Sequence, residues 1–146
     1  MNWRRLQIGI SWLLFVGWAA GVTWLSSLPG SALPRIRVPM PHFDKVVHWF
    51  IFFVGALCLM LALRVSWPEK RRRWAAWFTM VVLSIFGFAN EWQQLWTPGR
   101  TGGSLGDVAA NTVGVLTGCL FCLLLQGGWK RWQNSRDPQR DRCSSR

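Results

Sequence analysis

A chain of 146 residues that is 51% hydrophobic and holds 12 Trp has the length of one domain but not the composition of a soluble one. Its formal net charge of +11 is concentrated between and beyond apolar runs, which argues for a membrane partner and against nucleic acid. Four nearly uncharged runs, residues 8–25, 46–63, 74–95 and 108–125, each match the roughly 17–25 residues that cross a bilayer. The sequence therefore predicts an all-α integral membrane protein, a bundle of four transmembrane helices.

The basic residues predict the orientation of this bundle. Of the 17 Lys and Arg, all but Arg35, Arg37, Lys45 and Arg100 lie at the N-terminus, between the second and third runs, or in the C-terminal tail. Because cytoplasmic loops carry the excess of Lys and Arg, we expect both termini in the cytoplasm. The basic clusters then face anionic lipid headgroups.

The N-terminal segment has the basic start and apolar run of a signal peptide, but the run is too long and no small-x-small cleavage site follows it. We therefore expect an uncleaved first helix, in which Gly17 and Gly21 allow another helix to approach closely. Residues 1–127 are expected to form the membrane domain, and residues 128–146 a basic, disordered cytoplasmic tail. Cys119 and Cys122 have the spacing of a redox or metal motif, but on an apolar helix we interpret them as packing residues.

Polar residues gather at one level of the predicted bundle. The second helix begins, the third ends and the fourth begins at the outer face, so their polar ends meet at the same leaflet. These polar residues are Asp44, Lys45, His48, Asn90, Glu91, Gln94, Arg100, Ser104, Asp107 and Asn111. A charged group inside a span costs roughly 2.5–3.5 kcal/mol, so such groups need partners or a function. The sequence therefore predicts one outward-facing polar pocket.

Helical phase supports this convergence. At about 100° per residue, Asp44 and His48 share a face with Gly55, while Asp107 and Asn111 share a face with Gly114. Each polar stripe runs into glycines, which let helices approach closely. The polar groups should therefore face the interior of the bundle and not lipid.

Simpler roles compete with function at several of these positions. Asp44 is a candidate N-cap, and Ser104-x-x-Asp107 has the spacing of a capping box. The amides of the cluster are alternatively ordinary partners for hydrogen bonds between helices, and its one arginine is alternatively a counter-charge for an acid. Glu91 and His48 are the strongest functional candidates, because neither is needed as a cap and both lie deeper in the span.

The cluster has acid–base capacity. The candidate catalytic residues are Glu91, His48 and Asp107, with Glu91 or Asp107 as general base and His48 as its partner. The candidate ligand-binding residues are Asp44, Lys45, Asn90, Gln94, Arg100, Ser104 and Asn111. His42, His48 and the carboxylates are chemically able to bind a divalent metal, but they lack a recognised ligand spacing. We therefore predict no metal and no cofactor, and the sequence leaves open whether the protein is an enzyme.

Several motifs follow one another in a fixed order. They are Asp44-Lys45-x-x-His48, Asn90-Glu91-x-x-Gln94, Pro98-Gly99-Arg100, and Ser104-x-x-Asp107-Val108-x-x-Asn111-Thr112-x-Gly114 with Gly118. This ordered set, with the Ser-Ser-Leu-Pro-Gly turn that begins at Ser26, resembles the VanZ-like family over residues 24–118. The resemblance implies a multi-pass protein of the bacterial cytoplasmic (inner) membrane, whose polar site faces the periplasm. The family's namesake is associated with resistance to the glycopeptide teicoplanin.

The function expected from residues and resemblance together is binding or processing of a lipid-linked or phosphate-bearing component of the cell envelope. Lys45 and Arg100 would engage its anionic headgroup, while Glu91, His48 and Asp107 would transfer protons or orient the ligand. The expected partners are therefore membrane lipids and a lipid-linked envelope precursor. One alternative is a small proton-coupled transporter, which with four helices would have to form a homo-oligomer. Another is a non-catalytic structural or interaction protein, whose polar cluster only joins helices.

Overall fold

The computed structural model describes residues 2–32, 41–100 and 102–136, which form helices and turns with no strand among them. The expected all-α membrane architecture is confirmed, because four of the helices are long and apolar enough to cross a bilayer. In chain order the elements are α1 (Trp3–Ser27), the short 3-10 helix η1 (Gly30–Ala32), α2 (Phe43–Ser66), α3 (Glu69–Arg72), α4 (Ala75–Gln94) and α5 (Leu105–Arg136).

The long helix α5 extends further than the sequence suggested. It continues through Gly127 and Gly128 to Arg136, into the segment expected to be a disordered tail. No proline interrupts residues 128–136, and Lys, Arg and Gln are good helix formers, so the hydrogen-bond ladder continues beyond the apolar run. The rest of the expected tail, residues 137–146, lies outside the described residues.

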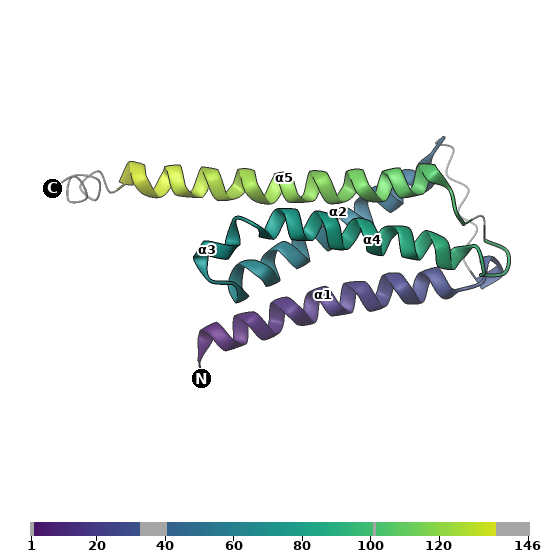
Figure 1. Ribbon diagram of the computed structural model, residues 1–146, viewed down its shortest axis with the longest axis horizontal. Coiled ribbons are helices and arrows are strands. Elements are labelled where there is room, and N and C mark those ends of the chain that lie inside the picture. The colour runs from purple at the N-terminus through teal and green to yellow at the C-terminus, as the bar shows by residue number, and fades with distance from the viewer. Residues whose placement is uncertain (1, 33–40, 101, 137–146) are drawn as a thin grey trace.

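The four long helices lie side by side, with their axes along the length of the molecule (Figure 1). Helix α3 and both ends of the described chain lie at one end of the bundle, while η1 and the α4–α5 loop lie at the other. Helix α2 is central and packs against α5, α1 and α4. The starts of α2 and α5 and the end of α4 therefore meet at the end that carries η1, as the polar pattern predicted.

Glycines on α5 bring it close to α2. A Cβ on Gly114 would clash with the Trp49 carbonyl oxygen, and a Cβ on Gly118 would lie 2.8 Å from the Phe53 carbonyl oxygen. In lipid, helices associate through close packing and hydrogen bonds, since apolar contact with a neighbour gains little over contact with lipid tails. Only glycine, which has no side chain, permits the two backbones to come this close. The close approach places the polar start of α5 against the start of α2.

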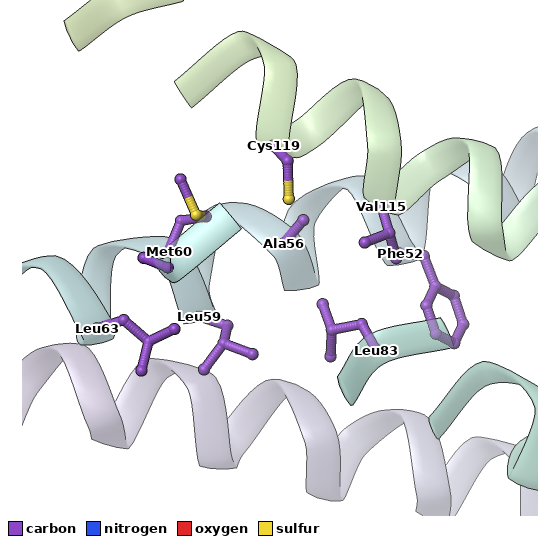
Figure 2. Packing of buried hydrophobic residues seen from close by; sticks show 9 residues of the cluster. Phe52, Ala56, Leu59, Met60, Leu63, Leu83, Val115 and Cys119 are labelled. Carbon is purple, nitrogen blue, oxygen red and sulfur yellow. The ribbon is translucent and has the colours of Figure 1, made fainter. Parts of the chain in front are cut away.

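The apolar core fills the middle of the bundle and the half nearer α3. It consists of Phe52, Ala56, Leu59, Met60, Leu63, Ala75, Leu83, Val115 and Cys119 (Figure 2). Indole N–H groups add hydrogen bonds between helices, with Trp12 donating to the Ser66 hydroxyl at 2.9 Å and Trp18 to the Ile51 carbonyl at 2.9 Å. This core leaves the other end of the bundle to polar side chains.

Candidate functional site

A partly buried ion pair joins the first turns of α2 and α5. Lys45 Nζ lies 2.8 Å from Asp107 Oδ1 and 3.0 Å from Asp44 Oδ2. The Asp107 side chain is 12% exposed, whereas the Asp44 side chain is 60% exposed and lies at the edge of the cluster. The N-cap of α2 is His42, so Asp44 is an acid of the first turn and not the cap that the sequence suggested. Its charge still favours the positive end of the helix.

One turn deeper, His48 links α2 to both neighbouring helices. Its Nδ1 lies 3.1 Å from Asn111 Oδ1 of α5 and 3.6 Å from Glu91 Oε1 of α4. Asn111 and Glu91 are 1% and 2% exposed, which places both below the surface of the bundle. Three helices therefore contribute one polar side chain each to the same point.

The buried end of α4 carries polar atoms that lack partners. Gln94 Nε2 donates to Glu91 Oε1 at 3.4 Å, and Asn90 Nδ2 donates to the Phe86 carbonyl at 3.0 Å. Among the described residues no hydrogen-bond partner reaches Asn90 Oδ1, Glu91 Oε2 or Asn111 Nδ2. A buried unsatisfied polar group costs about 1–3 kcal/mol, more if it is charged. These atoms are suited to a ligand.

Arg100 does not neutralise an acid of the described chain. Its Nε donates to the Leu28 carbonyl at 3.1 Å, and its Nη2 donates to the Leu25 carbonyl. These acceptors lie at the C-terminal end of α1, where carbonyls lack helical partners and the helix dipole favours a cation. A backbone hydrogen bond from Gly30 N to the Pro98 carbonyl, at 3.0 Å, brings the α4–α5 loop and η1 together. These contacts hold Arg100 beside the cluster, where it lines a pocket.

These side chains surround a pocket of about 210 Å³, which we call the end pocket. Its lining is Val22, Leu25, Ser26, Val47, His48, Ile51, Phe52, Asn90, Glu91, Gln94, Arg100 and Asn111. Asp107, Lys45 and Asp44 lie beside it, joined to one another through the ion pairs. Ser104 is not among the lining residues, and its carbonyl accepts the first hydrogen bonds of α5, from Asp107 N at 3.0 Å and Val108 N at 3.1 Å.

Sequence reasoning missed the contribution of α1. Val22, Leu25 and Ser26 form one wall of the end pocket, and Ser26 is only 7% exposed. Ser26 is a polar residue at the end of an apolar run, which is a signal that could have been read. Val22 and Leu25, the apolar residues of this wall, could not have been recognised from the sequence, because apolar residues line every face of a membrane helix.

An apolar groove of about 310 Å³ runs along α1 and α2 beside the end pocket. It is lined by Gly17, Trp18, Gly21, Val22, Leu25, Phe50, Ile51 and Val54, of which Val22, Leu25 and Ile51 also line the end pocket. Gly17 and Gly21 were expected to allow a close helix approach, but no described helix makes one there, because a Cβ on either would meet nothing within 4 Å. The two glycines instead leave open the space of the groove.

The site offers both proton-transfer groups and metal ligands. His48, Glu91 and Asp107 each place one candidate ligand atom within 4.8 Å of the others. They come from three different helices, so no spacing rule along the chain could have joined them. The same residues are the three candidate catalytic groups, and an imidazole beside a carboxylate is a common arrangement for moving a proton.

Fold and site together define a helical membrane protein of four spans, with a polar pocket at one end of the bundle that adjoins an apolar groove. A comparison with curated proteins finds an uncharacterized protein of the fission yeast Schizosaccharomyces pombe, 36% identical over 89 residues. The match covers 60% of this chain and 49% of the relative, so the chain spans about half the length of the curated protein that it matches. No family model and no solved structure matches the chain.

These comparisons correct the resemblance to the VanZ-like family. No model of that or any other family matches, and a eukaryotic relative points away from a bacterial family. The bacterial inner membrane and the link to teicoplanin resistance rested on the resemblance, so neither is carried further. Short polar motifs in apolar helices are a weak family signal, because capping and helix contacts favour the same residue types.

Proposed function

We propose that this protein binds a phospholipid, with the phosphate of the headgroup at Arg100 and one hydrocarbon chain in the apolar groove. The observation that carries the proposal is that the two cavities adjoin each other, since Val22, Leu25 and Ile51 line both. An amphipathic ligand needs a polar space and an apolar space that adjoin each other. A water-soluble ligand would not need the groove.

Arg100 supplies the cation for the phosphate. Among the described residues its partners are the backbone carbonyls of Leu25 and Leu28 at the C-terminal end of α1, which leaves N–H groups of the guanidinium for a ligand. A guanidinium binds phosphate oxygens in a bidentate fashion and keeps its charge at all relevant pH values. Lys45, which was also expected to bind the anion, is held by Asp107 and Asp44 and does not line the end pocket.

Deeper in the end pocket, Asn90 Oδ1 is a buried acceptor without a donor. A headgroup that carries hydroxyl or amine donors beyond its phosphate would satisfy this atom, whereas the choline headgroup has no donor to offer. The proposal therefore favours lipids such as phosphatidylglycerol over phosphatidylcholine. His48 and Glu91 lie beside the bound headgroup, so acid–base chemistry on the lipid is the reaction class that fits the site.

Charge supports an orientation in which the end pocket faces away from the cytoplasm. The end of the bundle that carries α3 and the described termini holds Arg4, Arg5, Arg64 and the basic run at residues 70–73. Among the described residues, the end that carries the pocket holds two basic side chains, Lys45 and Arg100. Positive charge accumulates on the cytoplasmic side. The bound lipid would then belong to the non-cytoplasmic leaflet.

Native mass spectrometry of the detergent-purified full chain tests the proposal. We expect phosphatidylglycerol to remain bound in preference to phosphatidylcholine of the same chain length. Nothing lies within 4 Å of a Cβ at Gly21, so the side chain of the variant Gly21→Leu should enter the groove and reduce lipid binding by about tenfold or more, the equivalent of roughly 1.4 kcal/mol. Arg100→Gln should weaken the binding of both lipids, because both carry the phosphate that Arg100 engages.

The matched control is Gly9→Leu. Gly9 lies on the same helix, its Cβ also meets nothing within 4 Å, and it does not line the groove. It makes the same change in apolar volume at a place where no lipid chain is proposed. Lipid binding by Gly21→Leu that equals that of Gly9→Leu and of the wild type would contradict the proposal.

A further inference from the structure

Three side chains with compatible metal-binding atoms converge beside the end pocket. His48 of α2, Glu91 of α4 and Asp107 of α5 each place one ligand atom within 4.8 Å of the others. A tetrahedral Zn²⁺ with bonds of about 2.0–2.2 Å holds its ligand atoms about 3.3–3.6 Å apart. The His48 Nδ1–Glu91 Oε1 distance of 3.6 Å fits this geometry, and Nδ1 would exchange its hydrogen bond with Asn111 Oδ1 for the metal. A small movement of Asp107 would complete the triad.

A second, independent observation points to a bound cation. Glu91 is 2% exposed, and no described residue donates a hydrogen bond to its Oε2. A buried carboxylate oxygen without a donor is costly in any protein and more so in a membrane span. Because Oε2 is an acceptor, a cation that the carboxylate binds through both oxygens satisfies it, and a further acceptor does not.

The net charge around His48, Glu91 and Asp107 is compatible with a bound divalent cation. Asp44, Glu91 and Asp107 belong to one cluster of acidic side chains. Among the described residues, Lys45 is the lysine that forms ion pairs with this cluster, through Asp44 and Asp107. With a neutral imidazole at His48, the cluster keeps a net negative charge. Lys45 contacts one oxygen of Asp107, and its side chain is 33% exposed, so it can move toward Asp44 and solvent when a metal binds.

We infer that His48, Glu91 and Asp107 bind one divalent transition-metal ion, Zn²⁺, with its fourth coordination position open toward the end pocket. An imidazole ligand favours Zn²⁺ over Mg²⁺ or Ca²⁺, which prefer oxygen ligands. Three protein ligands and one open position are typical of zinc sites that also bind a small ligand. His48 and Glu91 line the end pocket, so the open position faces its space. This inference does not depend on lipid binding.

The thiols of α5 are the main competitor for added zinc. Cys119 and Cys122 have a spacing found in zinc sites, although Cys119 is 2% exposed and belongs to the apolar core. His42 is an exposed imidazole close to the site in sequence, with the left-handed φ of 59° that Asn also adopts readily. Both features provide control variants.

The experiment uses the full chain, purified in detergent through a tag without histidine and stripped of metal with a chelator. Calorimetric titration with Zn²⁺ should show one saturable site per chain, and the Tm should rise until one equivalent is bound. The same concentrations of Mg²⁺ and Ca²⁺ should leave the Tm unchanged. His48→Ala and Glu91→Gln should lose the binding, while His42→Asn and the double variant Cys119→Ala, Cys122→Ala should keep it.

A wild-type measurement covers the case in which the ligand variants fail to fold. Co²⁺ substituted into the site should give the visible absorption of nitrogen and oxygen ligation, without a thiolate charge-transfer band. A thiolate band, or loss of Zn²⁺ binding in the cysteine variant alone, would overturn the inference. So would a metal-free wild type that takes up no Zn²⁺.

Discussion

Glu91 shows at the level of a single residue why this pocket is unusual for a membrane helix. One of its carboxylate oxygens accepts a weak hydrogen bond from Gln94 at 3.4 Å, and the other has no donor among the described residues. The imidazole of His48 lies 3.6 Å from Glu91 Oε1. By contrast, Asp107 has a full ion pair with Lys45 at 2.8 Å. The two buried acids therefore differ in what they contribute to stability.

This difference leads to a prediction about stability in the absence of metal. In detergent with a chelator present, Glu91→Gln should melt at or above the wild-type Tm, because it removes a poorly compensated buried charge and keeps the shape of the side chain. Asp107→Asn should melt several degrees lower, because Lys45 loses its buried partner. Thermal unfolding followed by intrinsic Trp fluorescence measures both.

The opposite order would change the interpretation of the site. If Glu91→Gln melted well below Asp107→Asn, the polar cluster would chiefly join helices, as in the structural alternative. Asp44→Asn serves as the control for an exposed carboxylate, since the side chain of Asp44 is 60% exposed. Its Tm should stay close to that of the wild type.

At the level of elements, the seam between α2 and α5 positions the site. Gly114 and Gly118 let α5 lie against the backbone of α2, and Trp49 Nε1 donates to Thr117 Oγ1 at 3.0 Å across the same seam. The ion pair and the His48–Asn111 contact lie at its polar end. Any change that separates the two helices therefore also separates the groups of the site.

We expect Gly114→Ala to destabilise the protein by about 1–3 kcal/mol, because the new methyl group would clash with the Trp49 carbonyl oxygen and force the helices apart. Unfolding in detergent by a chemical denaturant measures the change. Gly127→Ala is the matched control on the same helix, since nothing lies within 4 Å of its Cβ. It should be neutral or stabilising by up to about 1 kcal/mol, the difference in helix propensity. Equal effects of the two substitutions would show that close packing at Gly114 is unimportant.

At the scale of the whole molecule, the two ends of the bundle differ in character. One end carries α3, the described termini and a basic groove about Arg4, Arg64 and Arg72, while the other carries the end pocket. A transporter of the alternating-access type would need polar sites that open to both sides in turn. The described residues place their acidic cluster at one end only. This arrangement favours a site that serves one leaflet.

The orientation leads to a prediction about labelling. In a background without native cysteines, Trp96→Cys should react with a membrane-impermeant maleimide added to intact cells, because Trp96 is 76% exposed and lies in the α4–α5 loop. Glu69→Cys at the start of α3 should react only after the membrane is permeabilised. Both expectations follow from the excess of Lys and Arg at the end of the bundle that carries α3. The reverse pattern would place the end pocket in the cytoplasm.

Local patterns were sufficient to predict the helices and the level of the site. Apolar runs of bilayer length predicted four spans, and the meeting of Asp107, Asn111 and His48 followed from helix direction and phase. No described helix uses the approach that Gly17 and Gly21 allow, because a small residue permits close helix packing without requiring it. The same reasoning extended a family resemblance further than the comparisons allow.

The sequence by itself therefore determined the class of the protein, the number of spans and the end of the bundle that is polar, because each depends on hydrophobicity and charge along the chain. Tertiary structure alone decided that Arg100 binds carbonyls at the C-terminal end of α1, that α1 walls the end pocket, and that a groove adjoins it. It also brought the ligand atoms of His48, Glu91 and Asp107 within 4.8 Å of one another. These features depend on how helices pack and cross, since side chains far apart in sequence meet only where close packing of the backbones brings them together.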